Sequence, residues 1–154
     1  MNGDERSGSG EYLGRPTASW AALARSDDPT ERRLGVYALG ETGSADAVPL
    51  LEAALGDPLS FVRVWAAAAL ARADPEREED VVRALSAESS DPAGFVRSLV
   101  AWSLGRLDYQ RADSSAAVRT LRLLLDDPDA SVRAEAELAL HHLVRSAGRA
   151  DSAD

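Results

Sequence analysis

Three stretches of this sequence decide its fold: DPLSFVRVWAAAALARA (57–73), DPAGFVRSLVAWSLGRL (91–107) and DPDASVRAEAELALHHL (127–143). They align without a gap as Asp-Pro-x-x-x-Val-Arg, followed by a Leu seven residues after the Arg. A fourth copy begins at Asp28 if its turn is two residues shorter. The matched arginines are Arg32, Arg63, Arg97 and Arg133, spaced 31, 34 and 36 residues apart. A repeat of this period predicts stacked copies of one supersecondary unit.

Each unit is predicted to be helix, Asp-Pro turn, helix. Asp is a favoured helix N-cap and Pro suits the first helical position, so each Asp-Pro predicts the start of a second helix. Val62, Ala66 and Leu70 recur at helical spacing and form one apolar face. First helices are predicted over TASWAALAR (17–25), AVPLLEAAL (47–55), EEDVVRAL (78–85) and AVRTLRLLL (117–125). No alternating strand pattern bounded by hairpin turns occurs, so the predicted class is all-α.

This pattern resembles the HEAT repeat, and most closely its short bacterial form, the phycobilisome-lyase-like HEAT repeat. The residues that carry the resemblance are Asp57-Pro58, Val62-Arg63, Ala66, Ala69 and Leu70, together with ALGETGSADAVPLLEAALGDP (38–58). The resemblance implies a short α-solenoid of about four helical pairs. Glu31, where Val is expected, and Ser89, where Leu usually packs, depart from the pattern.

The repeat domain is predicted to span residues 17–146, with units over 17–43, 44–73, 74–108 and 109–146. The first 16 residues contain four Gly and two Ser without apolar periodicity. We therefore expect a disordered arm over 1–16 and a disordered tail over 147–154.

Composition narrows the class of partner. The 154 residues carry a formal net charge of −9, and all 17 basic residues are Arg. Nucleic-acid binding depends on cations that neutralise phosphates, so nucleic acid is a disfavoured partner. The sequence has no apolar run long enough for a membrane span and no signal-peptide pattern, which predicts a cytoplasmic location. Lys and Ile are absent, which is typical of a GC-rich, bacterial genome.

The repeated Asp and Arg residues are predicted to be structural. A catalytic constellation is needed only once, whereas these residues recur in every unit. We expect the turn aspartates to cap helices and to pair with arginines of adjacent units, which forms a ladder. The predicted ladder residues are Asp57, Arg63, Asp91, Arg97, Asp127 and Arg133. The alternative is that the aspartates are acids or metal ligands and that the arginines bind an anion.

No catalytic residue, metal site or cofactor is predicted. His141 and His142 are the only histidines, and neighbours on a helix point about 100° apart, so they cannot chelate one metal together. Cys is absent, and the sequence has no Gly-x-Ser-x-Gly elbow and no Gly-rich phosphate loop. We therefore expect a protein that is not an enzyme.

The aromatic residues on the second helices form the predicted partner-binding surface, because such helices line the concave face in HEAT-like stacks. Counted from the repeat arginine, these residues fall in three columns on one helical stripe. The candidates are Trp65 and Leu99, then Tyr37, Trp102 and Leu138, then Arg72 and Arg106. The alternative is that the aromatic rings pack between adjacent second helices.

The leading hypothesis is a non-catalytic scaffold or adaptor that binds a segment of another protein in its concave groove. The resemblance also implies two enzymatic or chaperone-like alternatives. One is a lyase-like protein that handles a tetrapyrrole on a client protein. The other is a protein similar to HEAT-like DNA glycosylases, against which the net charge of −9 and the lack of Lys both weigh.

Overall fold

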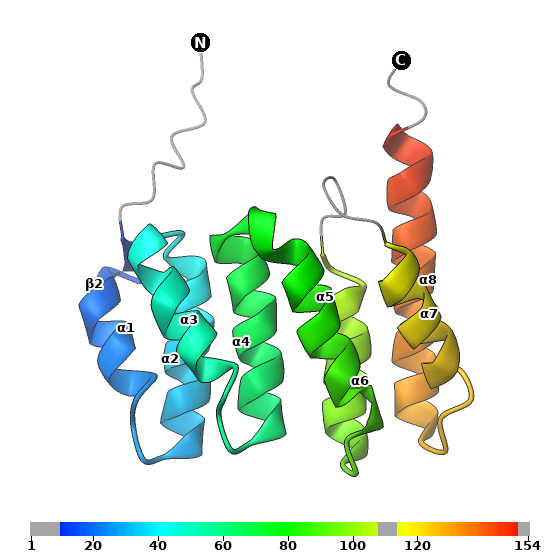
Figure 1. Ribbon diagram of the computed structural model, residues 1–154, viewed down its shortest axis with the longest axis horizontal. Helices are drawn as coiled ribbons and strands as arrows, with labels where there is room; N and C mark the ends of the chain where they lie inside the picture. The colour runs from blue at the N-terminus through cyan, green and yellow to red at the C-terminus, as the bar shows by residue number, and fades with distance from the viewer. Residues whose placement is uncertain (1–9, 108–113, 151–154) are drawn as a thin grey trace. The chain divides into compact units, whose positions relative to one another are not determined.

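The computed structural model describes residues 10–107 and 114–150, and the side chains of residues up to 145. The described part of the chain divides into two compact units at the boundary between Arg77 and Glu78. Figure 1 shows the helices of both. The elements of the first unit are β1 (Glu11–Tyr12), β2 (Arg15–Pro16), α1 (Thr17–Leu23), α2 (Pro29–Glu41), η1 (Ala45–Ala47), α3 (Val48–Ala54), α4 (Ser60–Ala73) and η2 (Pro75–Arg77). Those of the second are α5 (Glu78–Ala87), η3 (Glu88–Ser90), α6 (Gly94–Leu104), α7 (Ser115–Leu124) and α8 (Ala130–Ala150).

The predicted all-α class is confirmed, and each unit consists of helical pairs packed on their sequence neighbours. In the first unit α2 packs against α1, α3 and α4, and in the second α6 packs against α5, α7 and α8. The apolar face predicted for the second helices forms the core. Its fully buried members include Val62, Ala66, Ala69, Val96, Val100, Leu104, Val132 and Ala136.

Glycine allows two of these second helices to approach their neighbours closely. A Cβ on Gly40 would lie 2.7 Å from the Ala69 Cβ, and one on Gly105 would lie 2.6 Å from the Ala139 Cβ. Both glycines stand eight residues after the repeat arginine of their helix. This position therefore marks where α2 contacts α4 and where α6 contacts α8.

The prediction that each Asp-Pro aspartate is the N-cap is wrong for the three ungapped copies. In the first two of them α4 and α6 begin after Leu59 and Ala93, and neither N-cap makes a side-chain capping bond. Asp57 and Asp91 instead accept from the backbone N–H two residues later, at 2.9 and 2.8 Å. One residue, the proline, therefore separates each aspartate from its N-cap, and the carboxylate orders the turn rather than the helix end.

The first helical pair, α1 and α2, follows a different register from the one predicted. Asp28 is a true N-cap, because its Oδ1 accepts from the N–H groups of Thr30 and Glu31 at 2.7 and 3.3 Å. The residue six before the repeat arginine, where the other copies have Asp, is Ser26, and its hydroxyl accepts from the Asp28 N–H at 3.1 Å. The turn is therefore not two residues shorter. Ser26 takes the place of the turn aspartate.

The prediction of a disordered arm over 1–16 is wrong for residues 10–16, which form the β1–β2 hairpin; residues 1–9 lie outside the described part. Leu13 and Gly14, at the turn, have φ values of 52° and 68°, as a two-residue hairpin turn of type I′ requires. The hairpin is anchored by Trp20, whose Nε1–H donates to the carbonyls of Tyr12 and Arg15 at 3.3 and 3.2 Å. Strands of two residues leave no periodicity to detect.

At the other end, residues 147–150 belong to α8, so the tail prediction is wrong there. Residues 151–154 of the predicted tail lie outside the described residues.

A chain that begins at residue 17 should be less stable than one that begins at residue 10. Trp20 is only 3% exposed, and removal of the hairpin takes away both acceptors of its indole N–H and the Tyr12 ring beside it. We expect the free energy of unfolding to fall by about 2 kcal/mol in urea titrations. Equal unfolding midpoints for the two chains would show that the hairpin contributes nothing.

Candidate interaction surface

In the first unit the aromatic residues form a continuous row. The Tyr37 ring on α2 meets the Trp65 ring on α4 edge to face, with centroids 5.7 Å apart. On its other side it meets Tyr12 of the hairpin at 6.2 Å, and Tyr12 lies 5.9 Å from Trp20. Tyr12, Tyr37 and Trp65 are all half-buried residues. The row is therefore neither a sealed core nor a set of isolated surface rings.

A charged pair stands at the edge of this row. The Arg72 guanidinium lies 5.7 Å from the Tyr37 ring centroid and pairs with Glu41, with 3.0 Å between Nε and Oε1. The pKa of the Tyr37 hydroxyl is raised, first by the negative charge of Glu41 and then by burial. Since Arg72 is matched by Glu41, a ligand that takes its charge has to displace a carboxylate.

The second unit presents a smaller arrangement of the same kind. Trp102 on α6 is half-buried, and the Arg106 guanidinium lies 4.4 Å from its ring centroid. Leu99, three residues before Trp102, is half-buried, and Leu138 on α8 is 55% exposed. A cation over the face of a Trp ring makes a cation–π interaction, so this site combines an apolar surface with a positive charge.

The structure thus gathers some of the predicted residues and leaves others apart. Tyr37, Trp65 and Arg72 form one group within the first unit, and Trp102 and Arg106 form a pair within the second. The sequence prediction missed Tyr12. The Gly residues around it predict disorder, whereas Gly14 has the positive φ that the hairpin turn needs.

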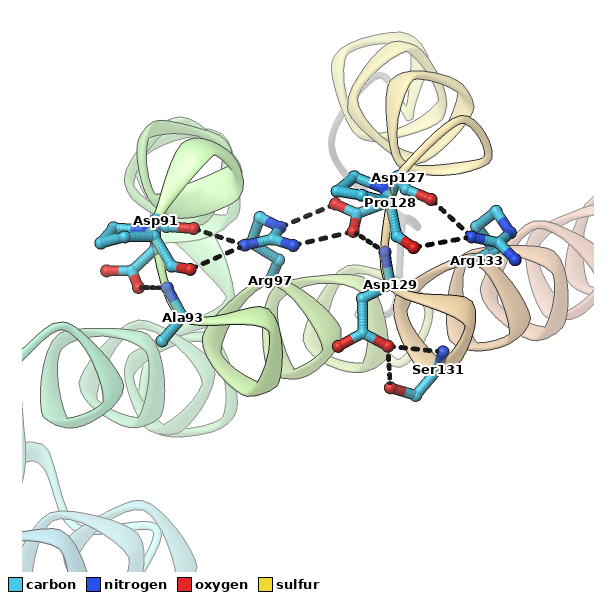
Figure 2. Close-up of polar contacts among 9 residues, drawn as sticks. Asp91, Ala93, Arg97, Asp127, Pro128, Asp129, Ser131 and Arg133 are labelled. Carbon is cyan, nitrogen blue, oxygen red and sulfur yellow. Dashed lines mark hydrogen bonds and ion pairs between the residues drawn. The ribbon is translucent and has the colours of Figure 1, made fainter.

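Bidentate Arg–Asp pairs join successive turns inside each unit, as Figure 2 shows for the second. Arg97 Nε and Nη2 donate to the two Asp127 carboxylate oxygens at 2.7 and 2.8 Å. In the first unit Arg32 donates to Asp57 in the same way, at 2.7 and 3.3 Å. The Arg97 and Asp127 side chains are only 13% and 5% exposed, so both charges are largely withdrawn from water. Such pairs hold consecutive turns at a fixed distance.

The remaining donor of each repeat arginine holds its own turn. Nη1 donates to the carbonyl oxygen six residues earlier, which belongs to Ser26, Asp57, Asp91 or Asp127, at 3.1, 2.8, 2.7 and 2.7 Å respectively. One guanidinium therefore closes its own turn and, in Arg32 and Arg97, also grips the next one.

Arg97→Ala should lower the melting temperature by several degrees, because it leaves the buried Asp127 carboxylate without its strongest donors. The matched control is Arg83→Ala, whose pairs with Glu79 and Asp80 are exposed; it should melt close to wild type. Circular dichroism melts of both variants check this. If Arg97→Ala melts like Arg83→Ala, the ladder pair has no structural role.

The stabilising effect of this pair should disappear in acid. Arg97 donates to Asp127 and so lowers the pKa of that carboxyl. Its folded pKa therefore lies below the unfolded value of about 3.9, and its contribution is present above that pH and is lost as the pH falls through the folded pKa. We expect the difference in unfolding free energy between wild type and Asp127→Asn to be constant near neutrality and to shrink below about pH 4. A pH-independent difference would contradict this.

His141 and His142 are exposed on α8, and no cluster of three or more His, Cys, Asp or Glu side chains suited to a metal ion occurs within residues 10–107 and 114–145. Among the described residues, no helix is long and apolar enough to cross a membrane.

Helical pairs, bidentate turn-to-turn pairs and half-buried rings on second helices define a helical-repeat protein. The family model for HEAT repeats matches residues 17–93 and 62–141, which together cover most of the chain. The chain belongs to the HEAT-repeat family. No curated protein matches the sequence. HEAT repeats are commonly scaffolds for protein interactions.

Proposed function

We propose that this protein is a non-catalytic adaptor that binds a segment of another protein on the exposed side of its second helices. The observation that carries this proposal is the half-buried state of Tyr37, Trp65 and Trp102, with a guanidinium over two of the rings. Such rings offer a large apolar area at low entropic cost, which is why Trp and Tyr dominate binding hot spots.

Each unit supplies its own part of the proposed surface. In the first unit the row Tyr12, Tyr37 and Trp65 runs from the hairpin across α2 to α4, so an apolar side chain of a partner can contact more than one ring. In the second unit Trp102, Leu99 and Leu138 expose apolar surface on α6 and α8. Membership of the HEAT family favours a protein as the partner. We propose in addition that this partner contacts the aromatic rings.

We further propose that the chain belongs with the short, phycobilisome-lyase-like HEAT repeats of bacteria and acts in the cytoplasm. The support is the resemblance of residues 38–58 to a repeat junction of that kind and the composition without Lys or Ile. Handling of a tetrapyrrole or of alkylated DNA would make it an enzyme or a chaperone instead. A visible chromophore on the purified protein, or salt-sensitive retention on DNA, would favour those alternatives.

The experiment that tests the adaptor proposal is affinity capture from the native host with wild type and the double variant Tyr37→Ala/Trp102→Ala in parallel. We expect to capture a protein that binds wild type and does not bind the double variant. Binding is then reconstituted from the two purified proteins. A partner retained equally by both would place binding elsewhere on the molecule.

A further inference from the structure

The repeat arginine of the last helical pair, Arg133, differs from Arg32 and Arg97, which each bridge two turns. Arg133 is placed like Arg97, because its Nη1 donates to the carbonyls of Asp127 and Pro128 at 2.7 and 3.1 Å, as Arg97 Nη1 does with Asp91 and Pro92 at 2.7 and 3.2 Å. Figure 2 shows that each guanidinium contacts the carbonyl groups of its own turn. The dashed lines from Arg133 reach only the carbonyls of Asp127 and Pro128.

Among the described residues, no carboxylate pairs with the other side of this guanidinium. Arg97 uses Nε and Nη2 to hold Asp127, whereas no acidic side chain among residues 10–107 and 114–145 pairs with Arg133. Arg133 is half-buried and held by its turn, so the two donors are fixed in the geometry that receives an aspartate in Arg32 and Arg97. A planar, pre-positioned fork of this kind suits a carboxylate.

The neighbouring residues of α8 argue against a further stacked HEAT helix as the source of that carboxylate. His141 stands eight residues after Arg133, where α2 and α6 have Gly40 and Gly105, and it is exposed. Glu137 stands where those helices bury Val36 and Ala101. An imidazole and a carboxylate would keep a following helix from the close approach that the glycines allow.

We infer that Arg133 is a binding site for an aspartate in an acidic turn or peptide of a separate partner protein. The nearby α7 carries Arg119 and Arg122, both exposed, and has no acidic residue, which favours an acidic segment. This site does not depend on the aromatic surface, so either proposal stands if the other fails.

The test uses the turn that the molecule itself binds. The probe is a capped peptide of residues 55–60, LGDPLS, and its control is the same peptide with Asp57→Asn. The arginine Nε–H signals of the ¹⁵N-labelled full chain report binding at each guanidinium. We expect the Asp peptide, at about 10 mM, to shift the Arg133 signal and leave that of Arg97, already paired, in place. The Asn peptide should bind at least about tenfold more weakly.

Two variants separate the fork from simple charge. Because Arg133→Lys has no arginine Nε–H at that position, binding by the variants is followed on the backbone amide signals of residues 127–133. Arg133→Lys keeps the charge but loses the fork, so the peptide should no longer shift these signals, whereas Arg119→Lys should leave the shift unchanged. The comparison of the two peptides uses wild-type protein alone, so it tests the inference even if a variant does not fold. An unmoved Arg133 signal, equal binding of both peptides or full binding by Arg133→Lys would overturn the inference. So would a wild-type dimer that Arg133→Lys dissociates, because the occupant would then be a second copy.

Discussion

Gly35→Ala should reduce the free energy of unfolding by about 3 kcal/mol, the largest stability effect that we expect from a single methyl group in this chain. A Cβ at Gly35 would run into the backbone N of Ala24 and lie 2.7 Å from the backbone C of Leu23. Because these obstacles are backbone atoms at the end of α1, no side chain can rotate away. The clash therefore outweighs the roughly 1 kcal/mol by which Ala is favoured over Gly inside a helix. Urea unfolding measures the difference.

The matched control is Gly56→Ala, where the new Cβ has only one close neighbour, the Ala53 carbonyl oxygen at 3.5 Å. This variant should unfold within about 0.5 kcal/mol of wild type. If both glycines tolerate Ala equally, α1 and α2 are not packed as closely as described.

Trp102→Ala should weaken partner binding by about 2 kcal/mol or more, which is roughly a thirtyfold rise in Kd. Trp102 is half-buried and stacked under Arg106, so its removal takes away both the apolar platform and the cation–π contact. Tyr37→Ala should act similarly in the first unit, because it breaks the row between Tyr12 and Trp65. Calorimetry with the captured partner gives the affinities.

Leu123→Ala is the control for this comparison. Leu123 lies on the first helix α7 and is 75% exposed, so it is more accessible than Trp102 but lies off the second helices. It should leave Kd unchanged. If Trp102→Ala unfolds the chain at a temperature where Leu123→Ala is folded, the ring serves the core rather than a partner.

The sequence predicts the helical pairs because the pattern recurs. Val62 and Val96 occupy the same repeat position and are both buried, so each copy of the pattern supports the others. The pairing of Arg97 with the next turn also follows from repetition, since a charged residue kept at every turn needs a nearby partner. Family membership rests on the same regularity.

What the sequence does not predict is local and occurs once. The hairpin depends on two-residue strands and on the contacts of Trp20 with backbone carbonyls, which no periodic pattern reveals. Ser26 replaces the turn aspartate through a hydroxyl contact, while the Asp-Pro that resembles the other copies lies two residues later. The pairing of Glu41 with Arg72 also depends on how two neighbouring helices pack.

Site-specific photo-cross-linking is the most direct test of the claim that a partner binds along the second helices. Benzoylphenylalanine is placed at position 99 on α6 in one chain and at position 123 on α7 in another, and each is irradiated with the purified partner. Leu99 is half-buried beside Trp102, whereas Leu123 is exposed on a first helix. We expect a cross-link from position 99 and none from position 123. A cross-link from position 123 alone would contradict this claim.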